Sequence, residues 1–382
     1  MKVYKLLVSC ISVCVVLIVL TGCRNNLVNK WDNYTGDIDV NYNDSDIASV
    51  TTISSDNSEN IQSLITYEIP DYWEDELVTA VTDCNRVIND AEGGITTFLW
   101  YNDAHLSYSS RRSVPILKYL QDRTNIRFVN FGGDIVSDND EVEYNEIISQ
   151  LNEWREETLE LYNHHSVVGN HDDDIEEFAN RQDLYDFLLG DEDGKITDEN
   201  NKFCYYVDNP AEMTRYIYLS TGFDETTCDD ISFLIKALKG TQSDWHIVII
   251  SHIWFSYSDT STPTEGVVPE FAQVVLDVLD DYNNRTVGAE KGIEYDFRDA
   301  TASVEFCIGG HTHVDYEFYT EGGIPVILNE TDSYHLRGEN KGLHKTDEAS
   351  VSVIIADYDN RVVNIIRVGR GQSREVPLLS DR

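Results

Sequence analysis

The chain of 382 residues is long enough for one large α/β domain or two ordinary domains, and its 41% of hydrophobic residues is sufficient for a substantial core. Its formal net charge is −41 at pH 7. A surface of this charge repels nucleic acid and anionic lipid, so the composition argues against a protein that binds polyanions through its surface.

Residues 1–22 have the pattern of an export signal. Two lysines precede an apolar run from Leu6 to Leu20, which is short for a transmembrane span. The sequence Leu-Thr-Gly-Cys that ends at Cys23 resembles a bacterial lipobox, which implies cleavage before Cys23 and lipidation of its thiol. An uncleaved anchor helix is the alternative interpretation. Either one predicts that the remaining chain lies outside the cytoplasm, at the cell surface or in the periplasm, attached to a bacterial membrane.

Residues 23–67 are predicted to be the lipidated cysteine followed by a disordered spacer. This segment is rich in Asn, Asp and Ser and has little hydrophobic periodicity, so burial cannot offset the entropy lost on ordering it. Residues 68–382 are predicted to form the folded part. They contain neither an internal repeat nor a second linker.

Strands and helices alternate along the predicted folded part. The expected elements are a helix at 72–91, a strand at 96–100, a helix at 114–122, a strand at 126–129, a helix at 141–162, a strand at 166–168, a hairpin of 202–207 with 214–220, a helix at 229–238 capped by Asp229, a strand at 247–250, a helix at 269–282, a strand at 304–308 and short strands up to residue 368. This order predicts an α/β fold in which two mixed β-sheets pack as a sandwich flanked by helices.

Short polar clusters directly follow five of the apolar, β-branched runs. The clusters are Asp103-Ala104-His105, Gly133-Asp134, Gly169-Asn170-His171-Asp172, Ser251-His252 and Gly310-His311-Thr312-His313. Binding sites of α/β folds collect at the carboxyl ends of strands, so these side chains are expected to meet. Carboxylate, amide and imidazole donors suit divalent manganese, iron or zinc. One such cluster is usually a loop or a helix cap, but five together predict a metal site.

The order of these clusters resembles the calcineurin-like metallophosphoesterase superfamily, whose blocks read DxH, GD, GNH(D/E), (S/G)H and GHxH. The resemblance extends from about Thr96 to Asp315 and implies a four-layer α/β/β/α fold with two divalent metal ions. It implies the following ligands: Asp103, His105 and His313 for the first metal, Asn170, His252 and His311 for the second, and Asp134 as the bridge.

The same resemblance implies a phosphohydrolase that cleaves phosphomonoesters or phosphodiesters by in-line attack of a metal-bridging hydroxide. His171 would contact the phosphoryl oxygen or the leaving group, and Asp172 would orient His171. Two divalent ions outweigh the charges of Asp103 and Asp134, so the site can attract a small phosphoester to an otherwise acidic protein. The choice between monoester and diester, the native metals and the oligomeric state stay open.

A surface metal-binding lipoprotein with little or no catalysis is the alternative. The presence of His171 beside the complete ligand set argues against it, because a structural site needs no acid beyond its ligands. Among the remaining cysteines, a disulfide between Cys204 and Cys228 is left open. His164 and His165 precede the Asn170 cluster closely and are interpreted as groups that pack or that support the ligand residues, with contact to substrate as the alternative.

Overall fold

The described part of the chain begins after the predicted export signal and spacer. The computed structural model describes residues 69–106, 110–136, 144–159, 161–173, 185–186, 188–189, 194–197, 201–219, 225–256, 266–332 and 345–378. The predicted signal at 1–22 and the predicted spacer at 23–67 therefore lie outside the described residues. None of the helices that the structure describes is long and apolar enough to cross a membrane.

The first sheet combines parallel and antiparallel pairing, and β1 joins its two halves. Its described strands, in order across the sheet, are β15 (Arg374–Pro377), β14 (Val362–Gly369), β13 (Ser350–Asp357), β1 (Ile95–Tyr101), β2 (Phe128–Phe131) and β3 (His164–Ser166). β1 is parallel to β2 and antiparallel to β13, with Ile95 opposite Asp357 and Trp100 opposite Ser352. The late strands thus complete the sheet that the first strands begin.

The second sheet is also mixed. Its described strands, in order, are β11 (Tyr316–Tyr319), β12 (Pro325–Leu328), β10 (Ser303–Gly309), β7 (His246–Ser251), β6 (Thr214–Leu219), β5 (Tyr205–Asn209) and β4 (Ile196–Thr197). The central strands β12, β10, β7 and β6 are parallel to one another. A separate hairpin is formed by β8 (Val287–Glu290) and β9 (Ile293–Asp296).

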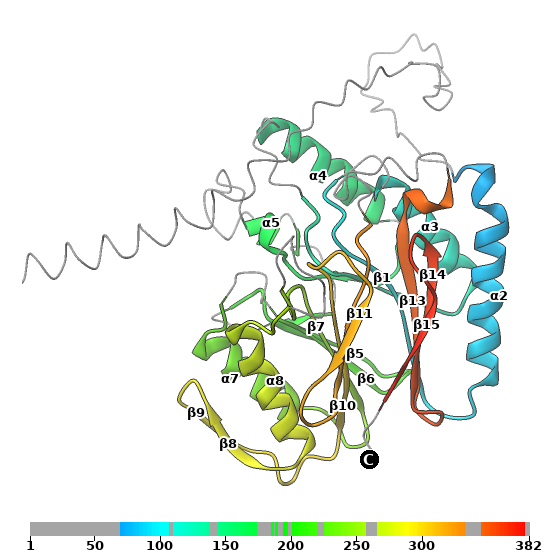
Figure 1. Cartoon of the computed structure of the whole chain (residues 1–382). Coiled ribbons are helices and arrows are strands. Elements are labelled where there is room, and N and C mark those ends of the chain that lie inside the picture. Colours follow the sequence, from blue (N-terminus) through cyan, green and yellow to red (C-terminus); the bar gives the residue numbers. More distant parts are fainter. Residues whose placement is uncertain are drawn as a thin grey trace, which may run out of the picture. The chain divides into compact units, whose positions relative to one another are not determined.

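Helices cover the outer faces of both sheets (Figure 1). The described helices are η2 (Asp71–Trp73), α2 (Glu74–Asp90), α3 (Ser110–Arg123), α4 (Tyr144–Thr158), α5 (Asn170–Asp173), α7 (Cys228–Lys239), α8 (Glu270–Asn283) and η6 (Thr346–Glu348). α2 and α3 contact β13 of the first sheet, whereas α7 contacts β6 and α8 contacts β10 of the second. The predicted sandwich of two mixed sheets flanked by helices is confirmed.

Alternation along β7 shows how the sequence builds two hydrophobic cores. Val248 and Ile250 belong to the core between the sheets, and Ile247 and Ile249 belong to the core between the second sheet and helices α7 and α8. All four side chains are fully buried, as expected for a central strand that is covered on both faces.

Phe98 of β1 connects the two sheets through aromatic contacts. Its ring centroid lies 5.7 Å from that of Tyr216 in an edge-on contact and 6.3 Å from that of Phe306 in a stacked one. Burial of each such ring contributes about 2 kcal/mol. These contacts therefore hold the two sheets face to face at the middle of β1 and β10.

α7 begins one residue before the predicted start, and its cap is Thr227 rather than Asp229. The Thr227 hydroxyl accepts a hydrogen bond from the amide of Asp230, and the Asp230 carboxylate accepts one from the amide of Thr227 at 2.7 Å. This reciprocal pair satisfies two amides that the first turn would otherwise leave unpaired.

Candidate metal centre

The predicted ligand loops leave the carboxyl ends of strands from both sheets. Asp103 follows β1, Asp134 follows β2, His252 follows β7 and His311 follows β10. In these loops the backbone turns sharply. The angle φ is positive, with values from 47° to 69°, at five predicted ligands: Asp103, His105, Asp134, His311 and His313. Positive φ at non-glycine residues costs about 1–3 kcal/mol each, and such strain is typical of functional sites.

Two groups of potential ligand atoms meet at these loops. Within the part of the chain that the structure describes, one group contains Asp103, His105, Asp134 and His313, and the other contains Asp134, His252 and His311. The ligand atoms of each group lie within 4.8 Å of one another. Asp134 belongs to both groups, which is the position that a bridging carboxylate would occupy.

Short distances tie the second group together. His252 Nε2 lies 3.0 Å from Asp134 Oδ2, and His311 Nδ1 lies 2.9 Å from Asn170 Oδ1. In the first group, His313 Nε2 lies 3.2 Å from Asp103 Oδ1. The structure thus brings together all seven side chains that the sequence predicts as ligands. Six of them belong to the two groups, and the seventh, Asn170, contacts the ring of His311.

Unsatisfied buried atoms test whether this set fits metal ions. Both ring nitrogens of His105 are buried and have no hydrogen-bond partner among the described residues, and the buried atoms Asp134 Oδ2 and His252 Nε2 face each other at 3.0 Å. A buried polar atom without a partner costs about 1–3 kcal/mol. Divalent cations would satisfy these atoms, and the mixture of carboxylate, imidazole and amide donors suits manganese, iron or zinc. The residues therefore fit a metal centre.

The protonation of the imidazoles agrees with this fit. Burial lowers the pKa of His105 and of His311 to about 4, so both rings are neutral at pH 7, the form that binds metal. Burial also lowers the pKa of His252, but the carboxylate of Asp134 raises it more, to about 10. A cation at this position would therefore displace a proton from His252.

Hydrogen bonds from the backbone orient the two central carboxylates. The amide of His311 lies 3.1 Å from both carboxylate oxygens of Asp103, and the amide of His171 donates to Asp134 Oδ1 at 2.9 Å. His252 Nδ1 lies 2.6 Å from the carbonyl oxygen of Gly132, which leaves Nε2 directed at Asp134. Metal-binding histidines commonly make such a bond through the second ring nitrogen.

Gly169 allows two of the loops to approach each other closely. A Cβ atom at this position would lie 2.7 Å from Asp134 Cγ and closer still to Asp134 Oδ1 and to its backbone nitrogen. A side chain at residue 169 would therefore displace the carboxylate that the two ligand groups share.

His171 lies at the exposed rim of the site. Its Nε2 is 4.0 Å from Asp134 Oδ2, its side chain is 27% exposed, and its ring centroid is 5.0 Å from that of His105. The imidazole is therefore close to the shared carboxylate and accessible from solvent, as a group that contacts substrate must be.

Asp172 makes bonds that sequence reasoning missed. The sequence predicts that Asp172 orients His171, whereas its fully buried carboxylate accepts hydrogen bonds from the backbone amides of Asp134, Val136 and Gly169 at 2.9–3.0 Å. These bonds tie the loop after β2 to the loop after β3. No pattern in the sequence identifies the amides that a buried carboxylate will contact.

Asn102 is a second residue that the sequence does not single out. Its side-chain amide donates to Asp103 Oδ2 and to the carbonyl oxygen of Asn329, and its side-chain oxygen accepts from Trp100 Nε1 at 2.7 Å. The adjacency of Asn102 to Asp103 is the only signal of this role in the sequence.

Other side chains near the predicted site have structural positions. Neither Cys204 nor Cys228 takes part in a disulfide, so the pairing left open by the sequence is not formed. His165 is buried against Phe128, and His164 contacts Phe131, in agreement with their interpretation as packing groups. Both therefore belong to the surroundings of the sheet.

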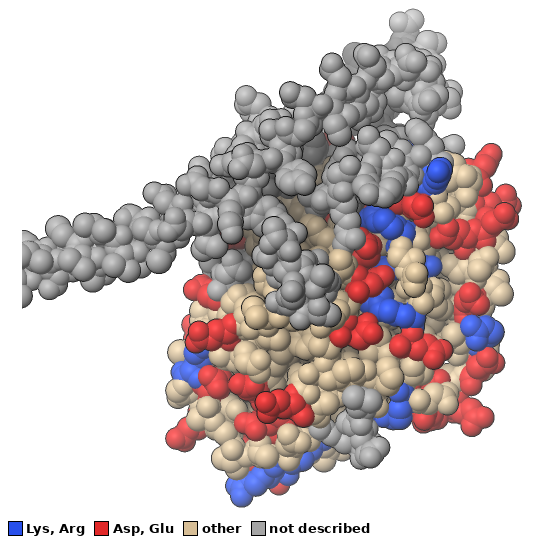
Figure 2. All heavy atoms as spheres, viewed as in Figure 1, with Lys and Arg blue, Asp and Glu red and all other residues tan. Residues whose placement is uncertain are grey.

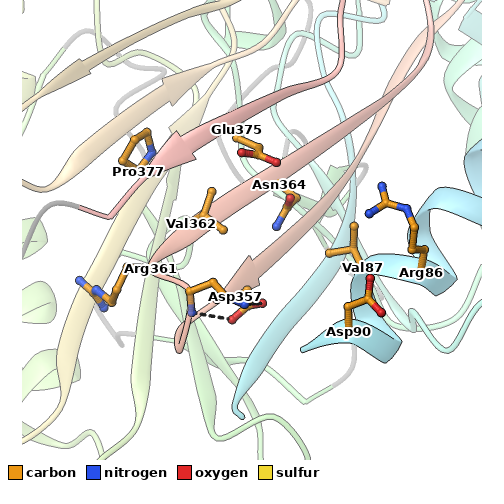
Figure 3. A pocket seen from close by; sticks show the side chains of 10 residues that line it. Arg86, Val87, Asp90, Asp357, Arg361, Val362, Asn364, Glu375 and Pro377 are labelled. Atoms are coloured by element: carbon orange, nitrogen blue, oxygen red, sulfur yellow. Dashed lines mark hydrogen bonds between the residues drawn. The ribbon is translucent and has the colours of Figure 1, made fainter. Parts of the chain in front are cut away.

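A separate hollow lies at the far end of the first sheet (Figure 3). It has a volume of about 540 Å³, and Arg86, Asp357, Arg361 and Glu375 are among its lining residues. Asp357 lies opposite Ile95, at the start of β1, whereas the ligand loops follow the ends of the strands. The hollow is thus distinct from the candidate metal centre.

Comparison with known proteins identifies the fold. No protein-family model and no curated protein matches the sequence. The structure is similar to that of a dimetal phosphatase from Danio rerio, with a TM-score of 0.52 and 15% sequence identity, and the match covers 75% of this chain and 100% of that chain. The chain therefore has the fold of this dimetal phosphatase.

Proposed function

We propose that the protein is a dimetal phosphohydrolase that cleaves small phosphomonoesters or phosphodiesters. The observation that carries this proposal is the position of Asp134, which is shared by two groups of potential ligand atoms. The similarity to a dimetal phosphatase supports the same function at the level of the fold. Binuclear hydrolases use a shared carboxylate to hold two cations about 3.5–4 Å apart.

The proposed ligands follow the two groups. Asp103, His105 and His313 would hold one cation, His252, His311 and Asn170 the other, and Asp134 both. When bound, the two cations supply Lewis acidity that polarises the phosphoester and lowers the pKa of water at the site. Manganese, iron and zinc all suit this donor set.

We assign proton donation or phosphoryl contact to His171. Its imidazole is near the shared carboxylate yet partly exposed, so it can reach a substrate oxygen while remaining outside the two ligand groups. A negative charge that develops on the leaving oxygen would be stabilised by the protonated ring. Asp172 would act by holding the Asp134 loop through backbone amides.

The proposed setting is a bacterial membrane surface outside the cytoplasm, with Cys23 as the lipid anchor. The signal-like N-terminus and the lipobox resemblance support it. Acidic side chains are scattered over the face seen in Figure 2, in keeping with the net charge of −41. Such a surface disfavours nucleic acid and favours small substrates that the cations attract locally.

Hydrolysis of chromogenic substrates tests the proposal. Protein from Asp71 onward, supplied with manganese, should hydrolyse an aryl phosphomonoester or phosphodiester, and a chelator should abolish turnover. His171→Ala should reduce kcat by about 100-fold or more while the bound metal content stays unchanged. His164→Ala is the matched control, because His164 contacts Phe131 and is expected to leave turnover unchanged.

The alternative function, a metal-binding lipoprotein with little catalysis, makes a different prediction. Metal would bind with the same stoichiometry, but neither class of ester would be hydrolysed, and His171→Ala would have no effect. Absence of turnover in fully loaded protein against a broad panel of monoesters, diesters, nucleotides and lipid headgroups would refute the proposed hydrolase.

A further inference from the structure

Arg367 on β14 is buried at the end of the first sheet that carries the ligand loops. Its side chain is only 2% exposed. It donates from Nη1 to Ser350 Oγ at 3.0 Å and from Nη2 to the carboxylate of Asp315 and to Asn329 Oδ1. A buried guanidinium is costly unless its donors are paired, so this position requires its acceptors.

Asp315 connects Arg367 to one ligand loop. It lies two residues after His313, and its Oδ1 atom also accepts from the amide of Glu330 at 3.1 Å and lies 2.8 Å from Arg374 Nη1. Two arginines from the last two strands thus hold one carboxylate at the end of the His311–His313 loop. We call Arg367, Arg374 and Asp315 the arginine clasp.

Asn329 connects the arginine clasp to the loop after β1, which carries Asp103. Its side-chain oxygen lies 3.4 Å from Arg367 Nη2 and 3.4 Å from Arg374 Nη2. Its carbonyl oxygen accepts from Asn102, which in turn donates to Asp103. Contacts therefore extend from the clasp to loops that carry ligands of the same group, Asp103 on one side and His313 on the other.

We infer that Arg367 is a positioning residue for the metal centre, acting with Arg374 through Asp315 and Asn329 on the loops that carry His313 and Asp103. The inference rests on the proposed metal centre and extends it to the C-terminal strands. Outer contacts of this kind set the orientation of ligands, and their loss typically reduces metal affinity by about 10–100-fold.

The shape of the guanidinium explains why arginine occupies this position. Its planar fork presents several donors in fixed directions, so one side chain can bond Asp315, Asn329 and Ser350 together. A lysine ammonium at the end of a flexible stem cannot reach these acceptors in the same arrangement. A positive charge alone is therefore insufficient to hold these acceptors, and Arg367→Lys should keep only part of the metal affinity of the parent protein.

Manganese binding to the metal-free protein tests the inference, with isothermal titration as the measurement. Arg367→Met should weaken manganese binding by about 10–100-fold at one site at least, and Arg367→Lys should give an intermediate loss. The matched control is Arg361→Met. Arg361 precedes the same strand at its other end, pairs with Glu305 at 3.3 Å and lines the distant hollow, so manganese affinity should not change (Figure 3).

Circular dichroism and thermal unfolding establish that each variant is folded before titration. Parental affinity in Arg367→Met overturns the inference, as does an equal loss in Arg361→Met, because that would indicate general destabilisation. If Arg367→Met is insoluble, Asp315→Asn, which keeps the size of the side chain, is titrated instead, and parental affinity there is equally decisive. A parent protein that binds manganese without hydrolysing any ester refutes the proposed function, while the affinities still decide the role of Arg367.

Discussion

Gly169→Ala provides a sharp test of the close approach between the loops at the metal centre. The backbone of Gly169 does not have a positive φ, so alanine can adopt its conformation and only the added methyl group is tested. That methyl would lie 2.7 Å from Asp134 Cγ. The methyl would lie closer still to Asp134 Oδ1 and to the backbone nitrogen of Asp134, so both the carboxyl group and the loop backbone must move. To reach an ordinary contact of about 3.4 Å, Cγ alone must retreat by at least about 0.7 Å.

This retreat has two measurable consequences. Overpacking of a tight site costs about 1–3 kcal/mol in the free energy of unfolding. The shift also strains the bond from the His171 amide to Asp134 and changes the position of the shared carboxylate within both ligand groups. A displacement of about 1 Å in a catalytic group can cost about 100-fold in rate. We therefore expect manganese affinity and phosphatase turnover each to fall by about 100-fold.

Urea unfolding of the metal-free protein and titration with manganese measure the two effects separately. Gly94→Ala is the matched control, because a methyl there would meet its nearest neighbours, His246 and Tyr358, at 3.7 Å. The control should keep parental metal affinity and stability to within about 0.5 kcal/mol. Parental manganese affinity in a folded Gly169→Ala protein would show that Asp134 does not depend on this close approach, and the reasoning about the shared carboxylate would be refuted.

Other residues give independent predictions. Burial lowers the pKa of His164 in the folded protein to about 4. As the pH drops from about 6.5 to 4, the unfolded chain is protonated at His164 before the folded protein is, so the free energy of unfolding falls. His164→Gln should remove up to about 3 kcal/mol of this loss, as measured by urea unfolding at pH 4 and pH 7. Phe98→Ala should reduce the free energy of unfolding by about 3–5 kcal/mol in chemical denaturation, because the fully buried ring joins the two sheets. In the native domain from residue 71 onward, Ellman's reagent should label Cys228 alone, because Cys84, Cys204 and Cys307 are buried and should react only after unfolding. Rapid labelling of more than one thiol in the native protein would contradict the described packing.

Local patterns in the sequence predict most of the elements and the members of the metal centre. β-Branched runs such as residues 247–250 predict buried strands because their side chains must be covered on both faces, and the structure confirms this. The polar clusters that follow these runs contain the side chains that meet in the two ligand groups. Such features are readable because residue type and short spacing carry them, without reference to distant parts of the chain.

Contacts between distant parts of the chain were decided only by the tertiary structure. Nothing in residues 350–377 indicates that their strands join β1, about 250 residues earlier, and not the second sheet. The same holds for Arg367 and Asp315, which are 52 residues apart, and for the bonds of Asp172 to the Asp134 loop. The physical reason is that alternation and charge specify which side chains must be covered or paired, whereas the partner is chosen by how the folded sheets and loops pack together.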